Sequence, residues 1–231
     1  MEPFLTVYHG SKREISQPHA DDSRVLSGFG AGFYVTPFRQ VAGEWACRDA
    51  EDGVVSSYRL DMQGLAVLDF TADKYNVLNW AATMLQHQTE DEFSIPTMEA
   101  RKAYLIEHYA VDIAGCDMIY AWRTDGSFFF CVEQFLSALL SVEGLDRVIT
   151  ACSSDMQIVL KTQQAMDALC FLGSEPVRCQ QYGQQDDGGM RFIFPADNRV
   201  LELVKESAKA FIKNAYQRTS IFDLMLNDRR E

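Results

Sequence analysis

The chain has 231 residues, and 47% of them are hydrophobic, which is enough to fill the core of one large domain. This composition excludes a disordered chain. The formal net charge of -12 disfavours a broad binding face for nucleic acid or for an anionic membrane, because like charges repel.

No targeting segment is apparent. The first residues, Met1-Glu2-Pro3, carry neither a basic start nor an apolar run, so no signal peptide is expected. The most apolar stretch, residues 128–140, is too short to span a membrane and contains Glu133. The sequence therefore predicts a cytoplasmic protein without a transmembrane segment and without a membrane partner.

The cysteine and histidine spacings predict neither a disulfide framework nor a metal site. None of the 6 cysteines forms a Cys-x-x-Cys pair, and most lie within apolar runs, as buried reduced thiols do. The 4 histidines lack the spacing of metal ligands.

The first predicted strand, residues 4–8, is followed by a turn at His9-Gly10-Ser11. Gly28, Gly30 and Gly32 then lead into a second strand over residues 33–36. Glycine lets a ligand approach the backbone, and an aromatic strand offers a stacking surface, so this pair suits a small-molecule cleft. The alternative is the rim of a hairpin that carries one surface histidine.

The remainder of the chain mixes both kinds of element. Residue spacing predicts helices over 38–48, 73–88, 96–109, 128–140, 145–152, 163–172 and 200–218. Strands are predicted over 56–61, 65–70, 117–122, 156–161 and 177–182. This order favours an α+β fold over the regular alternation of a doubly wound sheet. We expect one domain over residues 1–195 and a C-terminal helical extension over 196–231 that packs on it.

The three glycines do not form a dinucleotide-binding turn, because their spacing differs from Gly-x-Gly-x-x-Gly and they precede a strand. An ordered series of other short motifs runs from Tyr8 to Gly173. The series is Tyr8-His9-Gly10-Ser11, Gly30-Ala31-Gly32-Phe33-Tyr34-Val35-Thr36, Ala42-x-x-Trp45-Ala46, Ser57-Tyr58-x-Leu60-Asp61, Leu65-x-Val67-Leu68-Asp69, Tyr75-Asn76-x-Leu78-x-Trp80, Arg123-x-Asp125-x-Ser127-x-Phe129, Gln157-x-Val159-Leu160-Lys161 and Phe171-Leu172-Gly173.

This series resembles a bacterial family of uncharacterised domains that is grouped with the ADP-ribosyltransferases of the diphtheria-toxin and poly(ADP-ribose) polymerase type. The resemblance implies a split pair of antiparallel sheets with inserted helices that grip NAD, which is the substrate. It also implies that His9 binds the adenosine-side ribose, that Gly10 holds the nicotinamide amide through its backbone, and that Tyr34 stacks on the nicotinamide ring. The implied NAD-binding set is Tyr8, His9, Gly10, Ser11, Gly32, Tyr34, Thr36 and Arg123.

ADP-ribosyltransferases of the His-Tyr-Glu type carry a glutamate on a late strand, and the resemblance places Gln157 at the matching position. A glutamine cannot take up a proton or neutralise an oxocarbenium ion. The implied catalytic set is therefore Gln157, Tyr34 and a compensating acid, ranked Asp125 before Asp155 and Glu133. Each acid also has a purely structural alternative: Asp125 as a turn residue, Asp155 as a residue at a strand end, and Glu133 as a partner in a salt bridge. Arg123 is expected to meet the pyrophosphate, with an ordinary ion pair as the alternative.

The resemblance implies an NAD-dependent ADP-ribosyltransferase, as a toxin, effector or defence component with an unknown acceptor. A neutralising partner protein is expected for a toxin, and the acidic charge weighs against nucleic acid as acceptor. One alternative is a catalytically weak or inactive module of the same fold that binds NAD, another nucleotide or a protein. A purely structural scaffold is the second alternative.

Overall fold

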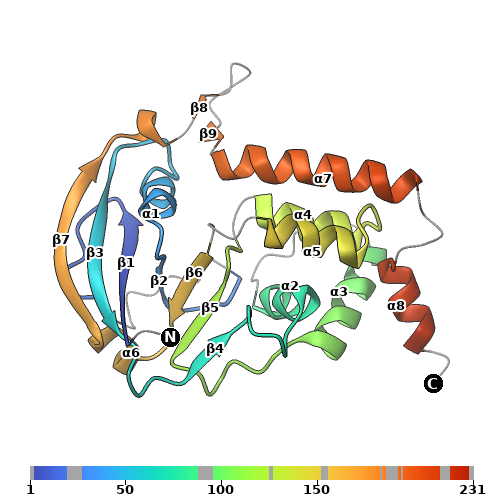
Figure 1. Cartoon of the computed structure of the whole chain (residues 1–231), viewed down its shortest axis with the longest axis horizontal. Helices are drawn as coiled ribbons and strands as arrows, with labels where there is room; N and C mark the ends of the chain where they lie inside the picture. The colour runs from blue at the N-terminus through green and yellow to red at the C-terminus, as the bar shows by residue number, and fades with distance from the viewer. Residues whose placement is uncertain are drawn as a thin grey trace.

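The computed structural model describes residues 3–19, 28–87, 96–124, 127–151, 156–182, 184–185, 192–193, 195–213 and 219–228. Within these ranges, a three-stranded sheet forms one side of the molecule and a four-stranded sheet lies in the middle (Figure 1). Most of the helices lie on the other side of the four-stranded sheet. The α+β class predicted from the sequence is confirmed.

The three-stranded sheet is antiparallel and has the order β1-β3-β7. Its strands are β1 (Phe4–Ser11), β3 (Gly53–Asp61) and β7 (Leu169–Val177). The prediction that the first strand breaks after Tyr8 is wrong, because pairing with β3 continues as far as Ser11 opposite Val54. His9 and Gly10 are therefore strand residues and not turn residues.

The four-stranded sheet has the order β2-β6-β5-β4. Its strands are β2 (Phe33–Val35), β6 (Met156–Leu160), β5 (Met118–Trp122) and β4 (Val67–Asp69). The pairs β2-β6 and β6-β5 are antiparallel, whereas β4 and β5 are parallel. The sheet is therefore mixed, because the chain returns from β4 to β5 through α2 (Val77–Gln86) and α3 (Pro96–Tyr109).

The predicted helix over residues 163–172 is wrong in its second half. Helix α6 (Gln163–Asp167) ends early, and β7 begins at Leu169. Leu169 and Phe171 alternate inward onto the core between the sheets, where the Phe171 ring lies 5.7 Å from that of Tyr58. The predicted strand over 177–182 is also wrong, because β7 ends at Val177 and residues 179–181 form a 3-10 turn.

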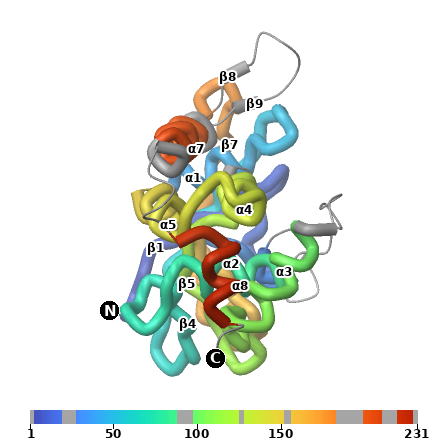
Figure 2. Tube along the Cα trace, turned by 90° about the vertical axis from the view of Figure 1, so that its right-hand side faces the viewer, coloured from blue at the N-terminus to red at the C-terminus, as the bar shows by residue number. Residues whose placement is uncertain are grey.

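The remaining helices pack in two places, the first on β1 and β3 of the three-stranded sheet and the others on the helical side of the molecule. They are α1 (Arg39–Ala46), α4 (Ser127–Leu136), α5 (Val142–Thr150), α7 (Pro195–Lys213) and α8 (Ile221–Asp228). Helix α7 runs along α4 and α5 (Figure 1). Helix α8 lies beside α3, where the Tyr104 hydroxyl donates to the Leu224 carbonyl at 3.0 Å (Figure 2). A two-residue pairing joins β8 (Gln184–Gln185) to β9 (Phe192–Ile193).

Local signals explain where the helices begin. Helix α2 begins at Val77, later than predicted, because Asn76 caps it: the Asn76 side chain accepts from the Asn79 backbone N–H while the Asn79 side chain accepts from the Asn76 N–H. None of the helices described is both long enough and apolar enough to cross a bilayer.

The largest core lies between the four-stranded sheet and the helices. At its centre the Trp80 indole N–H donates to the Trp122 carbonyl at 3.2 Å, and the two indole rings meet edge to face. A second core fills the space between the two main sheets and contains Val7, Phe33 and Tyr58. These side chains pack between the two sheets and hold the backbone of β1 and β2 where the sheets meet.

Candidate functional site

The two main sheets are joined at an isolated backbone bridge. The Tyr8 N–H donates to the Thr36 carbonyl at 2.8 Å, and the Thr36 N–H donates to the Tyr8 carbonyl at 2.9 Å. Continuing the same antiparallel register would place Gly10 opposite Tyr34. Instead, the Tyr34 carbonyl accepts a hydrogen bond from Nδ1 of His9 at 2.7 Å. The His9 side chain thus replaces a ladder bond at the point where the strands separate.

The contacts of His9 fix one tautomer of its ring. A carbonyl oxygen can only accept, so Nδ1 carries the hydrogen and Nε2 of the neutral ring is an acceptor. Burial lowers the pKa of His9, and the hydrogen bond to Tyr34 offsets this only in part. The ring also stacks on Phe33, with centroids 4.4 Å apart. The result is a held, neutral imidazole with one acceptor nitrogen.

The backbone groups of Gly10 face away from β3. Successive residues of a strand direct their N–H and C=O groups to opposite sides, and those of Tyr8 point toward Thr36. Those of His9 therefore point toward β3, and those of Gly10 point to the same side as those of Tyr8. The glycine itself is required by α1, because a Cβ at this position would lie 1.8 Å from the Ala42 carbonyl oxygen.

Tyr34 is held by the glycine-containing segment that precedes it. Its side chain leaves β2 on the face opposite to Phe33 and Val35 and is only partly buried. Its hydroxyl donates to the Gly30 carbonyl at 2.7 Å, and Gly30 has a φ of 71°, which favours glycine. A Cβ at Gly32 would lie 2.6 Å from a Val159 side-chain carbon, so this glycine allows close packing on β6.

Three further residues of the implied NAD-binding set, Thr36, Ser11 and Tyr8, make contacts within the protein. Thr36 is fully buried, donates to the Met156 carbonyl at 2.7 Å and accepts from the Phe38 N–H at 3.1 Å. The Ser11 hydroxyl donates to the Arg13 carbonyl at 2.6 Å. Tyr8 packs beneath α1. Thr36 therefore connects the bridge to β6 and to the start of α1.

A second polar group is buried at the ends of β5 and β6. Gln157 is 2% exposed, and its side-chain N–H donates to the Thr124 hydroxyl at 3.2 Å. The same hydroxyl accepts from the Gly28 N–H at 3.2 Å. We call the Tyr8–Thr36 bridge, with His9, Gly10 and Tyr34 beside it, the His9 junction. Gln157 is connected to it through its neighbour on β6, because the Met156 carbonyl accepts from the Thr36 hydroxyl.

Arg123 forms a buried ion pair with Glu44. The distance between Nη1 and Oε2 is 2.6 Å, and the two side chains are 5% and 3% exposed. The guanidinium carbon also lies 6.0 Å from the centre of the Trp45 ring. The ion pair is the alternative considered for Arg123 in place of a pyrophosphate contact.

Glu44 was missed as a member of this group. Its signal in the sequence is weak but present, because it follows Val41 by three residues and so lies on the apolar stripe of α1. A carboxylate on such a stripe costs free energy unless a cation pairs with it. The spacing indicates a buried acid but does not identify Arg123, 79 residues later, as its partner.

The candidate compensating acids are placed in part. Asp125 and Asp155 lie outside the described residues. Glu133 lies half-buried on α4, and burial raises the pKa of its carboxyl. The described ranges show no ion pair for it, so the salt bridge offered as its structural alternative is not seen there.

The described cysteines and acids form no evident metal site. Within the described ranges, no group of three or more histidine, cysteine, aspartate or glutamate side chains gathers as metal ligands would. Cys47, Cys131 and Cys179 are buried thiols, but Cys170 is exposed on β7, contrary to the expectation for a cysteine within an apolar run.

A model of the family described as protein of unknown function (DUF3990) matches residues 5–171. The chain belongs to this family. No curated protein and no solved structure matches the chain. The DUF3990 segment contains the His9 junction, the Glu44–Arg123 pair and Gln157. It ends within β7, so α7 and α8 lie beyond it.

Proposed function

We propose that the chain is an NAD-dependent ADP-ribosyltransferase with an ADP-ribosyltransferase-like pair of split sheets. The observation that carries this proposal is the separation of the strands beyond the Tyr8–Thr36 bridge, with a neutral His9 ring and a turned-out Gly10 backbone beside each other. These groups offer an acceptor nitrogen and an amide-like pair of N–H and C=O. The order of motifs in the sequence supports the same assignment.

Each group has a matching part of NAD. The Nε2 atom of His9 would accept from a ribose hydroxyl on the adenosine side. The Gly10 N–H would donate to the carboxamide oxygen of nicotinamide, and the Gly10 carbonyl would accept from the carboxamide NH₂. The partly exposed Tyr34 ring would stack on the nicotinamide, as flat aromatic groups do.

The proposed reaction breaks one bond and forms another at the same carbon. The bond between nicotinamide and the ribose C1′ breaks, and its electron pair leaves with neutral nicotinamide. An acceptor nucleophile then bonds to C1′ and loses a proton. The transition state resembles an oxocarbenium ion, as in glycoside cleavage, so a nearby negative charge would stabilise it.

The charges in this region favour a second candidate function, a module that binds NAD but turns it over slowly or not at all. Gln157 is uncharged, and the buried carboxylate of Glu44 is paired with Arg123. Neither group supplies a free negative charge to an oxocarbenium ion. Binding relies on His9, Gly10 and Tyr34, so it would survive in such a module.

The test is an NAD titration by calorimetry on the full chain, with nicotinamide release measured in parallel. We expect micromolar binding, which corresponds to about 8 kcal/mol. His9→Ala and Tyr34→Ala should each weaken binding by about tenfold, because each removes a hydrogen bond or a stacking surface worth about 1 kcal/mol or more. Tyr34→Phe should retain binding, because the ring is kept and only the hydroxyl bonded to Gly30 is lost.

The matched control is His108→Ala, which removes a histidine on α3 whose ring contacts Asp228. It should bind NAD like the wild type. An absence of NAD binding in the folded wild type would contradict both candidate functions. Binding without nicotinamide release would support the binding module over the transferase.

A further inference from the structure

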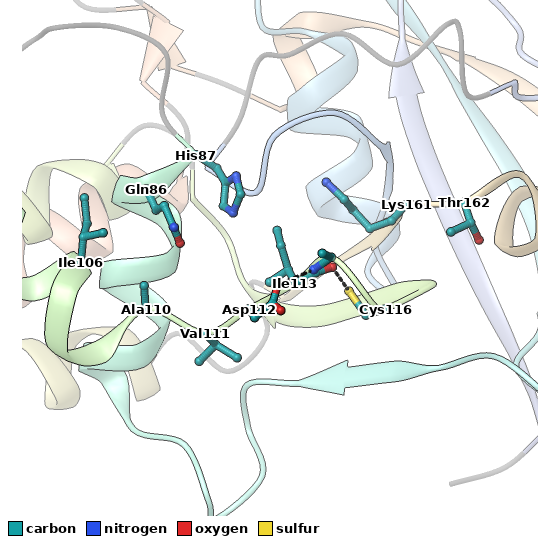
Figure 3. A pocket seen from close by; sticks show the side chains of 11 residues that line it. Gln86, His87, Ile106, Ala110, Val111, Asp112, Ile113, Cys116, Lys161 and Thr162 are labelled. Carbon is teal, nitrogen blue, oxygen red and sulfur yellow. Dashed lines mark hydrogen bonds between the residues drawn. The ribbon is translucent and has the colours of Figure 1, made fainter.

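A hollow of about 580 Å³ lies where the ends of α2 and α3, the loop before β5 and the end of β6 meet (Figure 3). This volume is in the range of sites for small metabolites. Its apolar wall includes Ile106, Val111 and Ile113, and its polar groups include Lys161 and His87. None of the proposed NAD-binding residues lines it, so it is a separate site.

Lys161 brings a half-buried positive charge to the hollow. Its ammonium donates to the Phe29 carbonyl at 2.7 Å and to the Ala31 carbonyl at 2.5 Å. An ammonium has three donors, so one more can serve a ligand. Among the described residues, no carboxylate forms an ion pair with Lys161. The two neutral carbonyls satisfy two of the three donors but do not compensate the positive charge, which favours an anion nearby.

His87 faces Lys161 across the hollow. Figure 3 shows the amino end of Lys161 and the ring of His87 pointing toward each other. Burial and the neighbouring charge of Lys161 lower the pKa of His87. An anion between the two groups would offset both effects, because it pairs with Lys161 and accepts from an imidazole N–H.

We propose that this hollow binds a small organic monocarboxylate, with its carboxylate on Lys161 and His87 and its apolar part against Ile106, Val111 and Ile113. Asp112 is also a lining residue, and its carboxylate accepts from the Ala114 N–H at 2.9 Å. The negative charge of Asp112 would repel a dianion such as a phosphate monoester more strongly than a monocarboxylate. This charge therefore favours a monocarboxylate over a phosphate monoester as the ligand.

The ligand would also act on the segment that holds Tyr34. Lys161 binds the carbonyls on both sides of Gly30, and the Gly30 carbonyl accepts from the Tyr34 hydroxyl. A carboxylate that fixes Lys161 therefore also fixes these carbonyls. Occupancy of the hollow is thus coupled to the position of Tyr34, whatever binds at the His9 junction.

The experiment is a titration of the full chain with hexanoate, followed by amide NMR. Hexanamide serves as a neutral probe of nearly equal size and apolar area. We expect hexanoate to bind with a dissociation constant of about 1 mM or tighter, which is reasonable for a ligand of about eight non-hydrogen atoms. Hexanamide should bind at least about tenfold more weakly, because a charge-assisted hydrogen bond is lost. Hydrogen exchange at the amides of residues 28–34 should slow with hexanoate.

Two variants remove different parts of the site. Lys161→Met should weaken hexanoate binding at least about tenfold, whereas Lys205→Met, an equal loss of charge at an exposed ion pair on α7, should not. Ala114→Leu fills the hollow from an exposed position and removes no side-chain hydrogen bond, so it tests the site even if Lys161→Met fails to fold. It should also weaken binding. Equal binding of hexanoate and hexanamide, unchanged binding in Ala114→Leu, or no hexanoate binding at about 10 mM would each overturn the proposal.

Discussion

His9 serves the fold and the candidate site through the same hydrogen bond. By donating to the Tyr34 carbonyl, it satisfies an acceptor that a continued ladder would otherwise have paired with Gly10. A strand residue with an apolar side chain could not do this, and the carbonyl would lose its partner. The same bond leaves Nε2 as an acceptor, so position 9 favours histidine for both reasons.

The pKa of His9 predicts how stability depends on pH. Burial holds the pKa of His9 in the folded protein below the ordinary value of 6.5, which applies to the unfolded chain. At pH values between these two pKa values, the unfolded chain therefore binds more protons than the folded protein. Stability from this group is complete above about pH 6.5 and is lost as the pH falls through this window. We expect the free energy of unfolding, measured with urea, to fall between pH 7 and pH 5. The slope should be at most about 1.4 kcal/mol per pH unit for each such histidine.

His9→Gln should reduce this slope, whatever it does to stability at pH 7. The pKa of His87 is also lowered, so His87→Gln should remove a further part and the double variant should show the flattest profile. A slope that is unchanged in His9→Gln would show that His9 titrates alike in both states, and the neutral ring inferred from its burial would be wrong.

At the scale of elements, the contact between α1 and β1 depends on Gly10. The backbone of α1 approaches so closely that a Cβ at Gly10 would overlap the Ala42 carbonyl oxygen and lie 2.7 Å from the Ala46 nitrogen. Helix α1 also carries Glu44 to Arg123, so its position sets the relation between the His9 junction and the end of β5.

Gly10→Ala should therefore lower the free energy of unfolding by about 1–3 kcal/mol, the usual cost of forcing extra volume into a packed contact. The measurement is the urea midpoint followed by circular dichroism. Gly115→Ala is the matched control, because nothing lies within 4 Å of a Cβ built there. It should change stability by less than about 1 kcal/mol. Equal midpoints for the two variants would contradict the packing assigned to α1.

The error at β7 shows where reasoning about elements stops. Residues 163–172 have a capping threonine before them and helical spacing within them, and the first five do form α6. The remainder pairs with β3 because Leu169 and Phe171 alternate inward onto the core between the sheets. Both periods fit such a short apolar run, and only the partner strand decides between them.

At the scale of the molecule, the C-terminal helices complete the main core. Val200 and Val204 of α7 and Ile221 of α8 are at most 5% exposed and belong to the same cluster as Trp80. The family match ends at residue 171, before either helix begins. The main core therefore extends beyond the matched segment.

A chain that ends at residue 194 should lose stability by roughly 5 kcal/mol or more, since three apolar side chains contribute about 1.5–3 kcal/mol each when buried. Thermal unfolding and binding of a hydrophobic dye would measure the loss. A chain that ends at residue 228 should unfold like the full chain, because it keeps both helices. If the shorter chain keeps the full midpoint, then α7 and α8 form an extension that the domain does without.

The sequence by itself determined the α+β class and most helices and strands, and it pointed to His9, Gly10 and Tyr34 as candidate site residues. These depend on local preferences for turns, caps and periodicity and on an ordered series of short motifs. Only the tertiary structure decided that β1 continues through Gly10, that β4 and β5 are parallel, that Glu44 pairs with Arg123, and that Lys161 and His87 share a hollow. The physical reason is that each of these depends on a partner distant in sequence, and local spacing does not specify which distant groups meet.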